Sequence, residues 1–384
     1  MAATPVRPTV ARVDLAAIRS NFRAVTALAG SESPTGVIAV VKANAYGHGA
    51  VPVARALEDA GAPMLAVADV EEGVLLREAG LRCPILVFGA LSVSPVAGVF
   101  DHRLTPTVST PGAARALEAA ARERGVVLHC HLKIDTGMNR LGFRHDNLRR
   151  TLPEVLASPH LAFDALFTHF ATADDPESPA MEEQRVRFED ACDKVGALGA
   201  AIPRRHAANS AAFLRDSRTW YDFVRPGLLL YGIVPPPLWS TLALKPALSL
   251  TSRVVAVKGA RPAEGVGYGL RHADAAPRAL AVIPAGYADG LDTRLSGRCS
   301  VLVRGRRAPI VGSVCMDMLT IDVTGIDPVA PGDEVVFIGE QGGERLDVRE
   351  MAAAIGTIPY EILCRIGARI QRVYDENEEM NAAP

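Results

Sequence analysis

The chain has 384 residues, 49% of them hydrophobic, and its 41 Lys and Arg against 43 Asp and Glu leave a formal net charge of −2. This length allows two domains, one of them large enough to be a barrel of about 250 residues. Because the sequence has no basic run that could form an electrostatic footprint, nucleic acid is not expected as a partner.

The six cysteines lie far apart, and no C-x-x-C spacing typical of zinc or redox sites occurs, so no metal is expected. Buried free thiols in a reducing cytoplasm are the expected state. The first residues contain no apolar signal region, and no apolar stretch reaches the length of a membrane span. The sequence thus predicts a cytoplasmic protein with no membrane partner.

The first chemically informative segment covers residues 37–49. Its apolar run 37–41 predicts a strand buried on both faces, and Gly-His-Gly at 47–49 predicts the turn into a helix. Lys42 then stands at the C-terminal end of that strand, where desolvation would lower the pKa of its amine and free it to attack a carbonyl. The alternative is that Lys42 only extends from the strand end into solvent.

Short apolar runs alternate with helical segments from about residue 36 to 232. The eight runs are 37–41, 64–68, 85–88, 104–108, 128–134, 163–168, 205–208 and 223–231. This repeated alternation favours an α/β fold with an N-terminal (β/α)8 barrel of the TIM type over an open doubly wound sheet. The missing G-x-G-x-x-G after the first run also argues against a dinucleotide fold.

A proline run at 234–237 interrupts the alternation and separates a predicted barrel domain, 9–236, from a mainly β domain, 245–384. Runs in the second domain are spaced by Gly, Pro and Asp turns; they are 248–257, 279–283, 300–303, 319–323 and 334–338. Residues 347–355 predict a helix with Asp347 as its N-cap. The opening strand 9–13 has no partner in the barrel, so we expect it to pair with the C-terminal sheet.

Polar side chains recur at the predicted strand ends, which is where barrel enzymes carry their active sites. They are Lys42 and Tyr46 after the first strand, Lys133, Asp135 and Arg140 after the fifth, His169 after the sixth, Asn209 and Ser210 after the seventh, and Arg225 in the eighth. A single histidine or arginine of this kind is more often structural. Their repetition predicts one site at the C-terminal face.

Small and hydroxyl-bearing groups follow the last two strands. The backbone N–H groups of Ser210 and Gly227, with the Ser210 hydroxyl, could bind a phosphate near a helix N-terminus. Alternatively, both residues only make tight turns. A reactive lysine that faces a phosphate site suggests pyridoxal 5'-phosphate as the cofactor.

Longer motifs lie in both halves of the sequence. The first half contains Val-Val-Lys-Ala-Asn-Ala-Tyr-Gly-His-Gly at 40–49, Lys-Ile-Asp-Thr-Gly-Met-Asn-Arg-Leu-Gly at 133–142, Thr-His-Phe-Ala-Thr-Ala-Asp at 168–174 and Ala-Asn-Ser at 208–210. The second half contains Arg-Pro-Gly at 225–227, Gly-Val-Gly-Tyr-Gly at 265–269, Gly-Tyr-Ala-Asp-Gly at 286–290, Cys-Met-Asp at 315–317 and Pro-Tyr-Glu at 359–361. With these motifs in this order, the chain resembles the alanine racemases, which are fold-type III pyridoxal-phosphate enzymes.

The resemblance implies interconversion of L-alanine and D-alanine by two-base proton exchange on a pyridoxal-phosphate aldimine, supplying D-alanine for peptidoglycan. Lys42 would hold the cofactor and exchange the α-proton on one face, and Tyr268 would serve the opposite face. Because a free tyrosine has a pKa near 10, using it as a base at pH 7 costs roughly 4 kcal/mol unless neighbours offset it. In the family, His169, Arg225 and His206 form the network linked to that tyrosine.

The resemblance also implies the remaining contacts. Arg225 would face the pyridine nitrogen and, since a guanidinium keeps its proton, would leave that nitrogen unprotonated and suppress transamination. The implied cofactor contacts are Tyr46, Arg140, His169, Asn209, Ser210, Gly227 and Tyr360, and the implied substrate contacts are Arg140, Met316, Tyr287 and Asp317. Lys133 matches a position that carries a carbamate in some members, where it would orient Arg140.

Tyr268, Met316 and Asp317 belong to the predicted β domain and in the family reach the active site of the partner subunit, which implies a homodimer with shared active sites. From its spacing alone, Tyr268 could also be only a turn residue between glycines. Ser313 stands where many members have an arginine that lines the entry corridor, so the breadth of substrates beyond alanine stays open.

Two other functions were compared with this one. A decarboxylase of the same cofactor and barrel type, acting on a basic amino acid, relies on a glycine-rich phosphate loop and a C-terminal Cys-Asp pair that this sequence lacks. A noncatalytic pyridoxal-phosphate carrier would be a lone barrel, and the motif Gly-Val-Gly-Tyr-Gly in a second domain argues against it.

Overall fold

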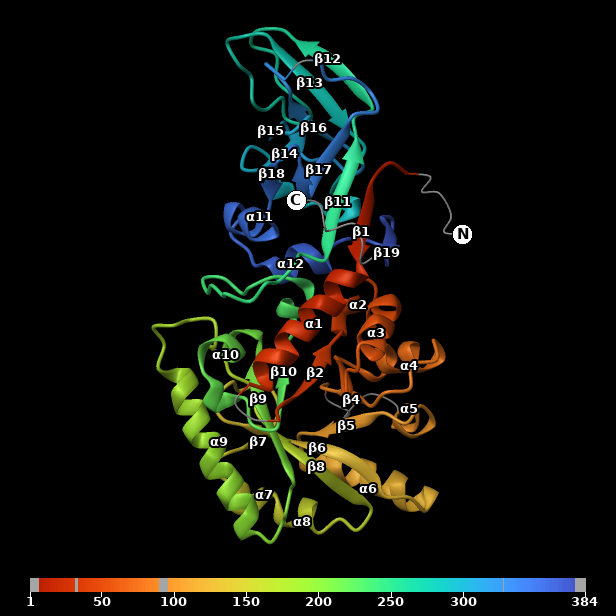
Figure 1. Ribbon diagram of the computed structural model, residues 1–384, viewed down its shortest axis with the longest axis vertical. Helices are drawn as coiled ribbons and strands as arrows, with labels where there is room; N and C mark the ends of the chain where they lie inside the picture. Colours follow the sequence, from red (N-terminus) through yellow and green to blue (C-terminus); the bar gives the residue numbers. More distant parts are fainter. Residues whose placement is uncertain (1–6, 32–33, 90–95, 327, 377–384) are drawn as a thin grey trace. The chain divides into compact units, whose positions relative to one another are not determined.

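The computed structural model describes residues 7–31, 34–89, 96–326 and 328–376 (Figure 1). The chain divides into two compact units. The described residues of 17–45 and 50–245 form the first, here called the barrel unit. The described residues of 1–16, 46–49 and 246–384 form the second, here called the β unit.

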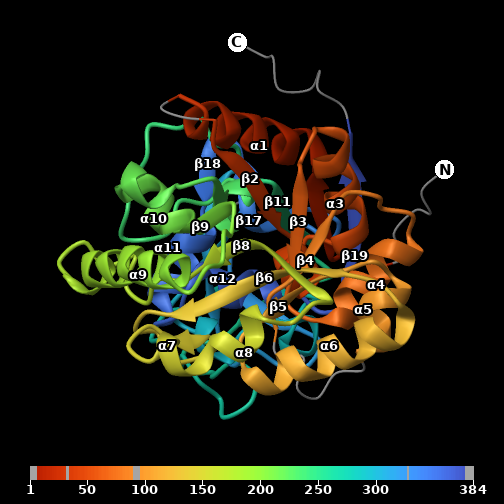
Figure 2. The ribbon, with the colours of Figure 1, turned by 90° about the horizontal axis from the view of Figure 1, so that it is seen from below.

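Parallel strands close into a ring in the barrel unit, seen end-on in Figure 2. In order of pairing they are β5 (Thr105–Val108), β4 (Ile85–Val87), β3 (Met64–Val67), β2 (Gly36–Val40), β10 (Phe223–Arg225), β9 (Arg204–Asn209), β8 (Leu161–Phe167) and β6 (Leu128–Asp135). Pairing of β5 with β6 closes the ring, and the short β7 (Phe143–Arg144) extends from β6. The predicted TIM-type barrel is confirmed, and its parallel strands bring all their C-terminal ends to one face.

Helices surround these strands (Figure 2). They are α1 (Leu15–Ala29), α2 (Lys42–Tyr46), α3 (Ala50–Asp59), α4 (Val70–Glu78), α5 (Ala97–Asp101), α6 (Pro111–Arg124), α7 (Leu148–Thr151), α8 (Pro153–Leu156), α9 (Ala180–Ala197), α10 (Ser210–Arg215), and the 3-10 turns η1 (Ser217–Thr219) and η2 (Leu228–Tyr231). Their limits follow the capping rules, as α6 illustrates: Thr110 accepts from the Ala113 N–H, Pro111 opens the helix and Gly125 ends it at φ 66°.

The eighth predicted strand is shorter than expected. Residues 223–231 were expected to form one strand, but β10 ends at Arg225, because Pro226 has no N–H to donate to the ladder. The apolar residues that follow form η2 and are fully buried. The Tyr231 hydroxyl donates to the Val40 carbonyl at 2.9 Å and so fixes this turn against the end of β2.

The β unit is built on one mixed sheet. Its strand order is β12 (Ala256–Ala260), β13 (Arg278–Ile283), β16 (Leu319–Asp322), β15 (Arg306–Val311), β14 (Ser300–Val303), β17 (Glu334–Gln341), β11 (Leu248–Arg253), β1 (Val10–Asp14) and β19 (Gln371–Asp375), with β18 (Glu344–Leu346) paired to β17. The opening strand β1 pairs antiparallel with β11 and parallel with β19. The mainly β C-terminal domain is therefore confirmed.

Several details of the β unit differ from the sequence expectations. The run 248–257 forms two strands, β11 and β12, rather than one, and β15, β18 and β19 were not predicted. The helix near 347–355 is confirmed as α11 (Val348–Ala354), with the Asp347 carboxylate accepting from the Arg349 N–H at 2.8 Å. The unit also contains α12 (Pro359–Cys364) and the 3-10 turns η3 (Tyr287–Asp289) and η4 (Thr293–Leu295).

Within the described part of the chain, every helix is too short or too polar to cross a membrane.

Candidate active site

Lys42 opens a left-handed turn directly after the first barrel strand. The four residues that follow it, Ala43, Asn44, Ala45 and Tyr46, have φ values of 53°, 53°, 53° and 51°. Residues with a Cβ rarely adopt this conformation, which costs roughly 1–2 kcal/mol each. Backbone strain of this kind persists only where the surroundings enforce it, and it concentrates at functional sites.

The carboxylate of Glu72 on α4 holds this turn. Its Oε1 accepts from the Ala43 N–H at 2.6 Å and its Oε2 from the Ala68 N–H at 2.8 Å. On the other side, the Asn44 Oδ1 accepts from the Ala50 N–H at 2.7 Å. Glu72 was missed by the sequence analysis, because an acidic residue in the first turn of a helix is also what the helix dipole favours.

The glycines of Gly-His-Gly are required by close packing within the β unit. A Cβ on Gly47, at φ 80°, would lie 2.1 Å from the Leu363 carbonyl oxygen, and one on Gly49, at φ 103°, would lie 1.9 Å from the Tyr374 hydroxyl. Beside them, the rings of Tyr46 and Tyr360 have centroids 5.8 Å apart. The structure thus brings together two of the predicted cofactor contacts, Tyr46 and Tyr360.

Arg225 lies in a buried polar network at the end of β10. It is 4% exposed, and its Nη2 donates to the carbonyls of Thr168 and Ala207, both at 2.8 Å. Its Nη1 contacts His206 Nδ1 at 2.8 Å and its Nη2 contacts His169 Nδ1 at 3.2 Å. Burial lowers the pKa of Arg225 to about 9, so the guanidinium stays charged at neutral pH.

The two histidines beside Arg225 are neutral, and their tautomers are defined. Burial, with the nearby Arg225 charge second, holds the pKa of both His169 and His206 well below the ordinary value. Because a guanidinium can only donate, both Nδ1 atoms must accept. A neutral imidazole has one N–H, so in His169 and in His206 the proton lies on Nε2.

The same network leaves the Nε–H of Arg225 available. Its hydrogen bonds to described residues all use Nη1 and Nη2, which leaves the Nε–H for another acceptor. An unprotonated pyridine nitrogen is such an acceptor. The donor set therefore fits the ring of pyridoxal phosphate.

Ser210 and Gly227 meet at the ends of β9 and β10. The Ser210 hydroxyl oxygen accepts from the Gly227 N–H at 2.9 Å, which leaves its O–H to donate. Asn209 caps α10, with its Oδ1 accepting from the Ala212 N–H at 2.9 Å. The Ser210 side chain is 3% exposed and is the hydroxyl donor available to a phosphate at this position.

Lys133 is a buried amine among other cations. It is 5% exposed, at the end of β6, and its Nζ lies 5.5 Å from the centroid of the Phe167 ring. Burial, then the charges of Arg140 and Arg225, lower the pKa of Lys133 to about 8. Arg140 is exposed and forms no hydrogen bond with another described residue, so its guanidinium is available to an anion.

Gln184 joins the ends of β6 and β8 and was also missed. It is 2% exposed, and its Nε2 donates to Thr136 Oγ1 at 3.1 Å and to the His169 carbonyl at 3.0 Å. Its Oε1 accepts from the Ala171 N–H at 2.8 Å. A glutamine within the buried stripe of α9 was the signal that could have revealed it, since buried amides need partners.

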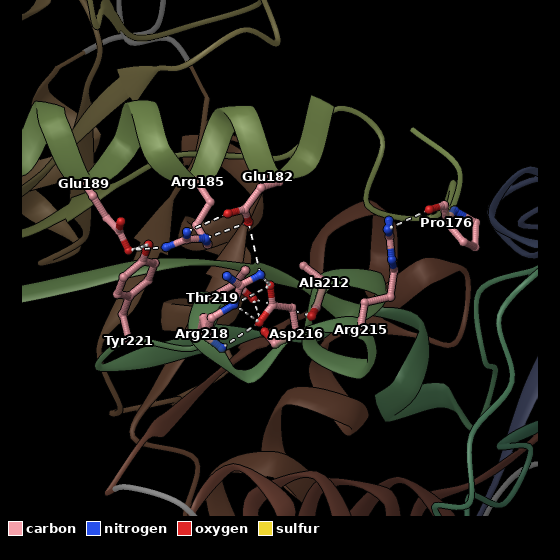
Figure 3. A network of polar contacts seen from close by, with 10 residues as sticks. All are labelled: Pro176, Glu182, Arg185, Glu189, Ala212, Arg215, Asp216, Arg218, Thr219 and Tyr221. Atoms are coloured by element: carbon pink, nitrogen blue, oxygen red, sulfur yellow. Dashed lines mark hydrogen bonds and ion pairs between the residues drawn. The ribbon is translucent and has the colours of Figure 1, made fainter. Parts of the chain in front are cut away.

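Helix α9 is tied to the α10 region by the charge network of Figure 3. Glu182 accepts from Arg185 at 2.7 Å and from Arg218 at 3.2 Å, and Arg218 also pairs with Asp216 at 2.7 Å. Arg215 donates to the carbonyls of the loop 172–176 that follows His169. These exposed pairs are structural: they support the segment that carries Ser210.

Tyr268 stands on a tight turn of the β unit. It is 77% exposed, and the turn is closed by a hydrogen bond from the Leu270 N–H to the Gly267 carbonyl at 3.1 Å. The Ser313 hydroxyl donates to the main-chain carbonyl of Tyr268 at 2.8 Å. The residue that departs from the family pattern therefore fixes the backbone of the predicted second base.

The β-unit motifs at 286–290 and 315–317 are hydrogen-bonded to each other. The Tyr287 N–H donates to the Cys315 carbonyl at 2.9 Å, and the Ala288 N–H donates to the Met316 carbonyl at 3.0 Å. Asp317 accepts from Arg369 at 2.7 Å. The side chains of Tyr287 and Met316 are 46% and 52% exposed.

The described residues contain no group of three or more His, Cys, Asp or Glu side chains placed to hold a metal ion. What the barrel unit offers instead is a lysine at a strained strand end, a hydroxyl beside tight turns, and a charged arginine whose Nε–H is available. Together with the closed barrel, these features define a pyridoxal-phosphate enzyme of the barrel class.

Comparisons with known proteins identify the family. Family models match both parts of the chain: the alanine racemase N-terminal domain matches residues 13–235 and the C-terminal domain matches residues 247–374. The alanine racemase of Halothermothrix orenii is 42% identical over 369 residues, covering 96% of this chain and 97% of that protein. That of Symbiobacterium thermophilum is 43% identical over 371 residues, with 96% and 97% covered.

Solved structures agree. The crystal structure of alanine racemase from D-cycloserine producing Streptomyces lavendulae matches with a TM-score of 0.93 at 36% identity, covering 98% of each chain. The alanine racemase of Bacillus anthracis with bound L-Ala-P matches with a TM-score of 0.89 at 34% identity, covering 98% of this chain and 97% of that one. The chain belongs to the alanine racemase family and is a pyridoxal-phosphate-dependent racemase.

Proposed function

We propose that this protein interconverts L-alanine and D-alanine, with Lys42 and Tyr268 as the two proton carriers. The observation that carries the proposal is the arrangement of Arg225. Its charge is maintained, both Nη atoms are bonded to protein acceptors, and its Nε–H forms no bond to a described residue and can meet a ring nitrogen. That nitrogen would receive a hydrogen bond but no proton.

This arrangement favours racemisation over the alternatives. Pyridoxal phosphate, when bound, delocalises the negative charge that remains once the α-proton has left. Arg225 limits that delocalisation, because it cannot protonate the ring nitrogen. The proton is then returned quickly to the α-carbon, and the longer-lived species that transamination needs is disfavoured.

Several residues would hold the cofactor. Lys42 would bind it covalently through Nζ, and Ser210, Gly227, Tyr46 and Tyr360 would bind its phosphate. The donor chemistry supports this, since the Ser210 O–H is not used in its own contact with Gly227. The further contacts would come from Arg140, His169 and Asn209.

The substrate would be bound by its carboxylate and enclosed by a few side chains. Arg140 would bind the carboxylate, which its exposed guanidinium supports. Tyr287, Met316 and Asp317 would line the pocket and favour a small side chain such as that of alanine. Asp317 already pairs with Arg369, so its role would be to position rather than to bind the ammonium group directly.

Tyr268 would act as a base with the help of His169. The His169 tautomer carries its proton on Nε2, so this nitrogen can donate a hydrogen bond to a phenolate. Such a bond offsets part of the roughly 4 kcal/mol needed to use a tyrosine as a base at neutral pH. Lys42 would exchange the proton on the other face of the substrate.

A homodimer with shared active sites would complete this chemistry. Tyr268, Leu270 and Met316 are 77%, 73% and 52% exposed in the single chain. Tyr268 and Leu270 share one turn, to which Ser313, three residues before Met316, is hydrogen-bonded, and large exposed side chains that lie close together are typical of a subunit interface. A second copy of the chain would cover them and receive Tyr268 into its barrel.

Lys133 would carry a carbamate. Its amine lies near the cations Arg140, Arg225 and Lys42, which repel an ammonium and attract an anion. With a pKa of about 8, a fraction of the amine is neutral near pH 7 and can attack carbon dioxide, forming a C–N bond and releasing a proton. The resulting anion would orient Arg140.

We also propose a cytoplasmic location, supported by six cysteines that form no disulfide in the described chain, and a role in supplying D-alanine for peptidoglycan. The test is incubation of the purified protein, loaded with pyridoxal phosphate, with L-alanine and with a panel of small amino acids. Loss of optical rotation with no release of carbon dioxide is expected. Release of carbon dioxide from a basic amino acid, without racemisation, would instead identify a decarboxylase.

A further inference from the structure

A third histidine lies directly behind the Arg225 network. His131, on β6, is 3% exposed, and its Nδ1 lies 2.9 Å from His206 Nε2. His206 Nδ1 in turn lies 2.8 Å from Arg225 Nη1. These contacts form a continuous buried row from His131 through His206 to Arg225.

Only one arrangement of protons satisfies this row. Arg225 can only donate, so His206 Nδ1 accepts, and the proton of neutral His206 lies on Nε2. His206 Nε2 therefore donates, and His131 Nδ1 must accept from it. If His131 donated instead, His206 would have to accept at both nitrogens, which a neutral imidazole cannot do.

We infer that His131 is a positioning residue for the racemisation: by accepting from His206 it selects the His206 tautomer that accepts from Arg225, and it thereby holds the guanidinium in place. This inference rests on the proposed role of Arg225 toward the cofactor ring. It assigns a function to a residue that forms no hydrogen bond with Arg225 itself.

The packing around the row supports this role. The Phe167 ring stacks on His206, with centroids 4.6 Å apart and an interplanar angle of 13°, and it meets the His131 ring edge-on at 6.4 Å. Neither imidazole can therefore rotate freely. Burial lowers the pKa of His131 to about 4, against a smaller opposing effect of Asp164, so the ring is a neutral acceptor at physiological pH.

Loss of the acceptor would reach Arg225 through His206. Without a partner for its Nε2–H, a buried His206 gains by placing its proton on Nδ1 or by turning its ring. An Nδ1–H would then face the Nη1–H of Arg225, donor against donor. Arg225 would move to relieve this clash, and its Nε–H would no longer meet the ring nitrogen in the same way.

The test compares two replacements of His131 in the holoenzyme. His131→Asn offers an amide oxygen close to the position of Nδ1, whereas His131→Leu fills a similar volume with no acceptor. We expect kcat to fall about 10- to 100-fold in the leucine variant and to stay within about threefold of wild type in the asparagine variant. The ratio of transamination to racemisation should rise in the leucine variant only.

A direct readout of the tautomer separates this inference from the proposed function. In protein labelled with 15N-histidine, and assigned with the aid of His206→Asn, the His206 signals should report a proton on Nε2 in the wild type and in His131→Asn but not in His131→Leu. An unchanged His206 tautomer and unchanged kcat in His131→Leu would overturn the inference. If the wild type does not racemise alanine, the proposed function fails. The NMR comparison still decides whether His131 selects the His206 tautomer.

The inference can still be tested if the leucine variant fails to fold. If His131→Leu does not fold, His131→Gln replaces it, because the longer glutamine places its amide near the Nε2 position rather than the Nδ1 position. Rescue by asparagine but not by glutamine supports the inference, and equal activity of the two variants contradicts it.

Discussion

The barrel unit and the β unit differ in how they hold the side chains proposed to act in catalysis. Arg225 of the barrel unit is 4% exposed and contacts four acceptors in its own unit. Tyr268 of the β unit is 77% exposed, and its hydroxyl forms no hydrogen bond with a described residue. A single chain is therefore enough to fix the orientation of Arg225. The side chain of Tyr268 needs contacts from another surface to fix its orientation.

In the proposed homodimer, this difference would correspond to a division of roles between two chains. A reactive group that is already buried and bonded is preorganised before any ligand arrives. A phenol on an exposed turn becomes specific only when a partner surface surrounds it. The comparison thus predicts that changes in the barrel unit act within one subunit and that changes at Tyr268 act on the partner.

The largest effect is expected for Lys42→Ala. Removing the amine should abolish cofactor attachment and lower racemisation by more than about 10³-fold, because covalent binding and one proton transfer are both lost. The measurements are the visible absorbance of the lysine-bound cofactor and the rate of D-alanine formation. Lys258→Ala, an exposed lysine of β12, is the control and should behave as wild type. Retention of the absorbance band in Lys42→Ala would show that Lys42 is not the lysine that binds the cofactor.

Tyr268→Phe should have a smaller and one-sided effect. We expect exchange of the α-proton to slow by about 10²- to 10⁴-fold from one enantiomer and much less from the other, since only one face loses its base. Exchange of α-deuterium from L-alanine and from D-alanine measures the two faces separately, so each enantiomer is the control for the other. Equal losses from both would count against two bases on opposite faces.

The buried histidines predict a loss of stability in acid. The pKa of His131 is about 4 in the folded chain against 6.5 for the free side chain, so between these values only the unfolded chain binds the proton. The folded state therefore loses stability as the pH falls from about 6.5 to 4, by up to about 3 kcal/mol from this group. Urea unfolding at several pH values measures the slope, which should be shallower for His131→Asn. An identical slope would show that His131 does not titrate in this way.

A smaller effect is expected for Glu72→Ala, which removes the acceptor of the Ala43 N–H in the strained turn and the acceptor of the Ala68 N–H. Loss of two hydrogen bonds from a carboxylate should destabilise the protein by about 2 kcal/mol and weaken retention of the cofactor, because the turn positions Lys42. Glu72→Gln keeps one acceptor and should be intermediate. The control is Glu71→Ala, at the neighbouring exposed residue, which should change stability and cofactor retention little. If the cofactor affinity of Glu72→Ala is unchanged, the contacts of Glu72 with this turn are not needed to position Lys42 for cofactor binding.

The positions of the barrel strands could be predicted from the sequence, because each barrel strand is a separate short apolar run. The error at 223–231 arose where an apolar run continued through Pro226 into a buried 3-10 turn, since hydrophobicity alone does not distinguish a strand from another buried segment. The strands β15 and β18 were missed because charged and small residues interrupt their apolar pattern.

The site could be predicted as far as its chemistry depends on residue type. Lys42, Arg225 and Ser210 were predicted from their positions at strand ends. Glu72, Gln184 and His131 were not, because each acts through a hydrogen bond to another chain segment, and only the folded structure shows which backbone groups or rings come within reach. The left-handed turn after Lys42 was also not foreseen, since Ala-Asn-Ala-Tyr contains no glycine to suggest it.

Mixing two inactive variants tests most directly whether each site is built from two chains. Lys42→Ala and Tyr268→Phe homodimers each have defective sites, but a mixed dimer would contain one site with both native residues. Denaturing and refolding the two variants together in equal amounts should restore about a quarter of the wild-type racemase activity per chain, as random pairing of subunits predicts. No activity above that of the separate variants, with mixed dimers shown to be present, would contradict the account.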